Sequence, residues 1–172
     1  AKERPSDSSS SSFNGQELPH LPYAYRHPDY WKMVMEEAKE GKDLIASRKM
    51  FDESERLHPL QKEELIKVEN IKGKIVFIGA KDDVLWDTVK YIQRMNERIK
   101  EYQTNIEVNN FIYEYGTHFV FPETMLKMMI PLFGDALARV FKSGRVHSKE
   151  CKKTRIDIDN NIQKIISEWI KK

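Results

Sequence analysis

Two apolar runs separated by a helix-like repeat dominate the hydrophobic pattern of the chain. Residues 75–78 are continuously apolar, as expected for a strand buried on both faces, and residues 106–115 form a second strand-like run. Between them, apolar residues recur at helical spacing: Leu85, Val89, Ile92, Met95 and Ile99. The pattern predicts a βαβ unit. A right-handed crossover would make its strands parallel and bring the loops that follow them to the same edge of the sheet.

The segments before this unit are of two kinds. Residues 1–24 contain the serine run Ser8–Ser12 and show no periodicity, so a loop or peripheral arm is expected. Residues 25–70 have the pattern of two amphipathic helices, and we expect them to form a helical, cap-like region. The residues predicted to start and stop these two helices are, in chain order, Pro28, Gly41, Asp43 and His58.

Residues 71–172 contain the βαβ unit and further helices, which makes the predicted fold class α/β. A methionine-rich segment, interrupted by Pro131, follows the second strand. Core packing is the favoured interpretation of its methionines at positions 125, 128 and 129, and the lining of a substrate channel is the alternative. The last predicted helix places four apolar residues on one face: Ile158, Ile162, Ile165 and Trp169.

The composition excludes several classes of protein. Of the 172 residues, 40% are hydrophobic and 33% charged, and the net charge of +2 with interspersed signs argues against a nucleic-acid-binding surface. No apolar stretch approaches the roughly 20 residues of a membrane span. Cys151 is the only cysteine, so a disulfide framework is excluded and a cytoplasmic location is expected, unless a preceding segment carries a signal. The histidines form no HExxH or Cys/His cluster, and we expect no metal or other cofactor.

The loops after the two strands carry acid and base side chains. Asp82 and Asp83 follow the first strand, and His118 follows the second. A histidine that acts as a general base needs its other ring nitrogen held by a carboxylate. Asp83 is the candidate for this carboxylate and Asp82 is the runner-up, since adjacent residues on a turn point in different directions. The alternative interpretation is a helix cap and a loop histidine without a catalytic role.

A nucleophile is missing from this pattern. In α/β-hydrolases, the nucleophile precedes the acid and the histidine, on a G-x-S-x-G turn between a strand and a helix. None of the seven glycines lies in such a turn, so we expect this chain to be the C-terminal part of a larger hydrolase. The serines of Ser8–Ser12 have the required chain order but no preceding strand, and Cys151 follows the histidine. Both are therefore weak candidates.

The residues around the two aspartates narrow the interpretation. Residues 68–88 resemble the strand-and-acid segment of the acyl-CoA thioester hydrolase / bile acid-CoA:amino acid N-acyltransferase family, in its C-terminal α/β-hydrolase domain. Ala80 and Asp87 stand where that family usually has glycine and proline, and residues 13–23 and 115–123 resemble two further family segments, with Thr117 in place of glycine. The matching positions of the acid segment are Glu69, Asp82, Asp83, Leu85 and Trp86. The resemblance covers roughly residues 10–171.

The resemblance implies a covalent acyl-enzyme mechanism acting on an acyl ester or acyl-CoA. It makes Asp83 the acid and His118 the base. Separately, Trp86 is a weaker candidate for a border of the acyl pocket, and helix-start packing is the commoner role of such a tryptophan. A serine or cysteine nucleophile would lie upstream of Ala1. The alternatives are another esterase or peptidase of the α/β-hydrolase fold, or a non-catalytic remnant that serves as an interaction module. Because the neighbouring upstream strand is expected to lie outside this sequence, the strand at 75–78 would present an open edge. Such an edge predicts binding to the N-terminal part of the parent protein or self-association.

Overall fold

The computed structural model describes residues 11–21, 29–102, 104–131 and 134–171. The strands are β1 (Ser12–Phe13), β2 (Gln16–Glu17), β3 (Lys74–Ala80) and β4 (Glu107–Tyr113). The helices before β3 are α1 (Tyr30–Gly41), α2 (Arg48–Leu57), η3 (Lys62–Glu64) and η4 (Val68–Asn70). The later helices are α3 (Thr88–Glu101), α4 (Glu123–Met129), α5 (Gly134–Ala138), α6 (Lys142–Val146) and α7 (Ser148–Ile170).

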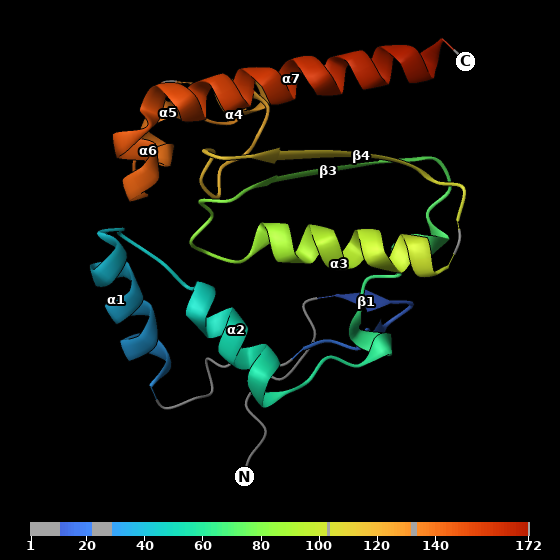
Figure 1. The fold of residues 1–172 in the computed structure, drawn as a ribbon, viewed down its shortest axis with the longest axis horizontal. Helices are drawn as coiled ribbons and strands as arrows, with labels where there is room; N and C mark the ends of the chain where they lie inside the picture. The colour runs from blue at the N-terminus through green and yellow to red at the C-terminus, as the bar shows by residue number, and fades with distance from the viewer. Residues whose placement is uncertain (1–10, 22–28, 103, 132–133, 172) are drawn as a thin grey trace.

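The predicted βαβ unit is present, with β3 and β4 paired in parallel and joined through α3. Their register runs from Lys74 opposite Glu107 to Ala80 opposite Tyr113. Helix α3 lies along one face of this pair and α7 crosses the other face (Figure 1). Within the described residues, β3 has no strand on its other side. The α/β class is therefore present, with a small parallel sheet in which neither β3 nor β4 has a second neighbouring strand among the described residues.

The core of the molecule lies between β3 and α3. Every second side chain along β3 points toward α3, and the helix presents its apolar residues, three or four positions apart, toward the strand. The buried cluster consists of Val68, Ile75, Phe77, Ile92 and Ile99. Beside it, Arg98 of α3 makes an ion pair with Glu69 of η4, and both side chains are nearly buried. This pair attaches the segment before β3 to α3.

The helical region differs from the prediction at the start of α2. Residue Ser47, and not Asp43, precedes this helix, while the carboxylate of Asp43 accepts a hydrogen bond from the backbone N–H of Lys142 at 2.5 Å. The Asp43 side chain therefore makes a tertiary hydrogen bond instead of capping the helix as its local sequence position suggested. Helix α1 ends at Gly41 as expected, and Pro28 lies outside the described residues.

The predicted N-terminal arm contains a hairpin that the periodicity argument missed. Strands β1 and β2 are antiparallel, and both turn residues, Asn14 and Gly15, have positive φ values of 51° and 76°. An Asn-Gly dipeptide is the strongest local signal for such a turn. This dipeptide would have revealed the hairpin in the sequence.

Two expectations for the C-terminal half also need correction. Met125, Met128 and Met129 are exposed to 39%, 78% and 56%, so they are not core residues. On α7, Ile158 is fully buried but Trp169 is 60% exposed, so the predicted apolar face is not buried along its whole length. Helical spacing shows which residues share a face, but it does not show how far the opposing surface reaches.

Candidate functional site

Asp83 and His118 lie close together at one edge of the parallel sheet. Strands β3 and β4 end in register at Ala80 and Tyr113, so the loops that follow them start side by side. Oδ2 of Asp83 lies 3.1 Å from Nδ1 of His118, although 35 positions separate the two residues. The hydrogen bond expected from the loop positions is therefore present.

The Asp83 carboxylate is 2% exposed, and both of its oxygens take part in hydrogen bonds. Its Oδ1 accepts hydrogen bonds from the backbone N–H groups of Leu85 and Trp86 at 2.9 and 3.4 Å, and its Oδ2 accepts from the Thr88 hydroxyl at 2.5 Å. Burial raises the pKa of Asp83, but the hydrogen bonds from His118, Thr88 and Leu85 outweigh it and hold the pKa below its ordinary value. The group is thus a carboxylate at neutral pH.

The neighbouring carboxylate of Asp82 has different partners. Its Oδ1 accepts from the backbone N–H groups of Gly116 and Thr117 at 2.9 and 2.8 Å. The hydroxyl of Ser143 donates to its Oδ2. The runner-up for the acid therefore contacts the backbone just before His118 and not the imidazole.

Aromatic rings surround the imidazole. The rings of Trp86 and His118 meet edge to face, with 4.4 Å between their centroids, and Phe119 contacts His118 at 5.7 Å. Trp86 in turn contacts Phe51 of α2, with 5.6 Å between centroids. Within the described residues, Nε2 of His118 makes no hydrogen bond. The side chain is 19% exposed, so this nitrogen is the ring atom left for a proton from another group.

Hydrogen bonds and an ion pair connect the start of helix α2 to the loop that carries Asp83 and Trp86. The backbone N–H groups of Ser47 and Arg48 both donate to the carbonyl of Val84, at 3.0 and 3.1 Å. The Ser47 hydroxyl donates to the carbonyl of Leu85 at 2.8 Å, and Arg48 makes an ion pair with Asp87. The first turn of α2 thereby satisfies the polar backbone of this loop, which limits how far the loop can move.

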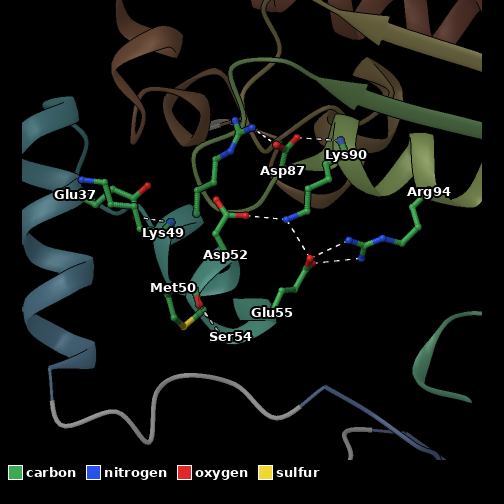
Figure 2. A network of polar contacts seen from close by, with 10 residues as sticks. Glu37, Lys49, Met50, Asp52, Ser54, Glu55, Asp87, Lys90 and Arg94 are labelled. Atoms are coloured by element: carbon green, nitrogen blue, oxygen red, sulfur yellow. Dashed lines mark hydrogen bonds and ion pairs between the residues drawn. The ribbon is translucent and has the colours of Figure 1, made fainter. Parts of the chain in front are cut away.

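Ion pairs join the remainder of α2 to α3 (Figure 2). Lys90 lies 2.8 Å from Asp52 and 3.2 Å from Glu55, and Arg94 lies 2.8 Å from the same glutamate. Sequence reasoning missed this connection. The sequence contains a pattern that could have indicated it. Asp52 and Glu55 are three positions apart on one predicted helix, and Lys90 and Arg94 are four positions apart on another, so each pair lies on one helix face.

An open groove of about 420 Å³ lies beside β3, with Trp86 among its lining residues. Its lining is mostly apolar and comes from the free side of the strand and from α3. The lining residues are Val76, Phe77, Ile78, Trp86, Thr88, Tyr91, Ile92 and Met95. Since side chains from both faces of β3 contribute, the groove follows the open edge of the sheet.

The weaker nucleophile candidates are not near the pair. Cys151 is 1% exposed, and burial raises the pKa of its thiol to about 11, which disfavours the thiolate. No contact joins it to His118. Ser12 is exposed in β1, whereas residues 8–10 lie outside the described part of the chain. The structure therefore brings no serine or cysteine of the described residues to the imidazole.

Metal-binding clusters and membrane-spanning helices are both absent from the described part of the chain. It contains no group of three or more His, Cys, Asp or Glu side chains that could hold a metal ion. None of its helices combines the length and the apolar character that are needed to cross a membrane.

Comparison of this chain with known proteins identifies its family. No curated protein and no solved structure matches the chain. The family model described as BAAT / acyl-CoA thioester hydrolase C terminal matches residues 12–137, which include both Asp83 and His118. This match covers well over half of the sequence, and the chain therefore belongs to the BAAT / acyl-CoA thioester hydrolase C-terminal family.

Proposed function

We propose that this chain supplies the acid and the general base of an acyl-transfer site in an α/β-hydrolase-type enzyme. Asp83 would orient the imidazole of His118 and stabilise its charged form. The observation that carries this proposal is the 3.1 Å contact between Oδ2 and Nδ1, made by a carboxylate that is buried and hydrogen-bonded on both oxygens. A helix cap alone would not require an imidazole at this distance.

The proposed reaction has two steps, with His118 as the proton carrier. In the first, Nε2 takes the proton of a serine or cysteine nucleophile, which attacks the carbonyl carbon of an acyl-CoA or acyl ester. The carbon–sulfur or carbon–oxygen bond breaks, and His118 returns the proton to the leaving group. In the second step, Nε2 deprotonates water or an amine, which attacks the acyl-enzyme carbonyl. The bond between the acyl carbon and the nucleophile breaks, His118 returns the proton to the nucleophile, and the acyl product leaves. No cofactor is needed.

We propose that the nucleophile comes from a part of the parent protein that precedes this sequence. Two observations support this origin. The matching family model describes a C-terminal region, and no glycine of the chain lies in a G-x-S-x-G turn. The same parent segment would provide the N–H groups that stabilise the developing oxyanion.

The open edge of β3 is the proposed attachment site for that segment. A parallel strand laid against β3 would pair the backbone groups of the edge and would occupy the groove beside it. It would also bring its own carboxyl end to the edge of the sheet where Asp83 and His118 lie. A nucleophile on the loop after such a strand would therefore approach the imidazole.

Trp86 is proposed to border the acyl group of the substrate. Its ring packs against His118, and 37% of the residue is exposed. Phe51 of α2 contacts the same ring, which supports the proposal that residues 25–70 act as a cap over this side of the site. An acyl chain would thus meet apolar surface next to the base.

The test uses the parent protein and the isolated chain with a set of acyl-CoA substrates, with thiol release as the readout. The parent should release coenzyme A, and His118→Ala and Asp83→Asn should each lower kcat by about 10⁴-fold. His58→Ala is the matched control, because this histidine pairs with Glu64 outside the site. The isolated chain should show no turnover above buffer, and unchanged rates in both site variants would refute the proposal.

A further inference from the structure

The turn that precedes His118 has an unfavourable backbone conformation. Thr117 has a φ of 59°, in the left-handed region that β-branched residues rarely adopt. The residue is completely buried, and its Oγ1 accepts a hydrogen bond from the N–H of Phe119 at 3.2 Å. His118 follows this turn directly, so the conformation of the turn determines where its imidazole begins. Some interaction must therefore offset the strain.

The space around Gly116 shows how tightly the turn is confined. A Cβ at this position would lie 2.5 Å from Cγ1 of Val120 and 3.0 Å from Cβ of Ala80, the last residue of β3. The turn thus lies directly against the end of the strand from which the acid loop departs. Small movements of one loop relative to the other would change the separation of the acid and the base.

The two Asp82 oxygens tie this turn to its surroundings. A single atom, Oδ1, accepts the consecutive N–H groups of Gly116 and Thr117 at 2.9 and 2.8 Å. Consecutive amides that converge on one anion form a concave site of the kind that backbone nests provide. The Ser143 hydroxyl on Oδ2 fixes the orientation of the carboxylate. Bonds to a charged acceptor are about twice as strong as neutral ones.

We infer that Asp82 is a positioning residue for His118. Its carboxylate holds the left-handed turn at Thr117 and thereby places the imidazole on Asp83. The inference rests on the proposed function, in which His118 is the base. The two adjacent aspartates would have separate roles, since Asp83 orients the ring and Asp82 orients the backbone that carries it.

Asp82→Ala tests this role by amide hydrogen exchange in the isolated chain and by kinetics in the parent enzyme. The amides of Gly116 and Thr117 should exchange at least tenfold faster, while the amides of β3 keep their protection. In the parent, kcat should fall at least tenfold with KM within twofold of wild type. Glu114→Ala is the matched control, because that carboxylate also bridges the two loops, through Lys81 at 2.7 Å, but bonds to neither amide of the turn. It should change neither readout.

Thr117→Gly distinguishes a positioning role of Asp82 from a general contribution to stability, because only the positioning role predicts a recovery of kcat. Glycine adopts the left-handed conformation without strain, so the turn depends less on its hydrogen bonds to Asp82. Combined with Asp82→Ala, it should recover at least threefold of the lost kcat. If the alanine variant does not fold, Asp82→Asn decides, since a neutral acceptor binds the amides more weakly and their exchange should rise at least threefold.

The outcomes separate this inference from the function on which it rests. Unchanged exchange and kcat in the Asp82 variants, together with a large loss of kcat in Asp83→Asn, would overturn the positioning role alone. Full activity in Asp83→Asn would instead overturn the proposed function. Loss of kcat in Asp82→Ala with no gain from Thr117→Gly would show that Asp82 acts by another route and would also overturn the inference.

Discussion

Gly79 lies directly against Thr88: a Cβ at position 79 would come within 2.7 Å of Cγ2 of the threonine. The hydroxyl of the same threonine donates to Asp83 at 2.5 Å. The absence of a side chain at Gly79 therefore allows α3 to approach β3 closely enough to supply a hydrogen-bond donor to the buried carboxylate.

Gly79→Ala should destabilise the chain by about 1–3 kcal/mol, because the added methyl also meets Cδ1 of Ile92 at 2.9 Å and forces α3 away from the sheet. Urea unfolding measures this change. Thr88→Ser keeps the hydroxyl on Asp83 and removes the methyl that clashes. In the double variant, part of the lost stability should return, and full additivity of the two changes would contradict the packing argument.

Asp83→Asn should make the free energy of unfolding less dependent on pH in the acidic range. The folded-state pKa of Asp83 is depressed, so its contribution is present above the ordinary carboxyl value of about 3.9 and is lost as the pH falls through the lower folded value. The free energies of unfolding of wild type and variant should therefore differ by a constant amount above about pH 5 and converge as the pH falls from there to below the folded pKa. A gap that widens toward acid would show that the pKa is raised.

Cys151 should react slowly with thiol reagents while the chain is folded. Its pKa of about 11 reduces the thiolate fraction at pH 8 by about two orders of magnitude relative to a free cysteine, and burial blocks access as well. Labelling by a disulfide reagent, with and without urea, measures the difference. Fast labelling without urea would place this thiol at an accessible site.

The isolated chain should associate through the open edge of β3. At tens of micromolar, light scattering should give a mass above 20.3 kDa, or the chain should co-purify with the preceding part of its parent. Val76→Lys, which places a charge in the groove beside this edge, should restore a monomer with unchanged circular dichroism. A monodisperse wild-type monomer would show that the edge does not mediate pairing.

Several features of the site follow from the sequence alone. Apolar runs and helical spacing predict the βαβ unit, and its parallel strands place the loops after positions 80 and 113 side by side. That topology is sufficient to bring Asp83 or Asp82 near His118. The prediction succeeds because hydrophobic periodicity is a local property of the chain, and two neighbouring strands joined through one helix are generally parallel.

Tertiary structure alone decided between the two aspartates. Their directions depend on hydrogen bonds from Thr88, the 116–117 backbone and Ser143, which are remote in sequence or set by loop dihedrals that no periodicity records. For the same reason, the 142 amide and not a helix end engages Asp43. A sequence pattern encodes burial and local conformation, whereas the partner of a polar side chain depends on which donors the completed fold brings within about 3 Å.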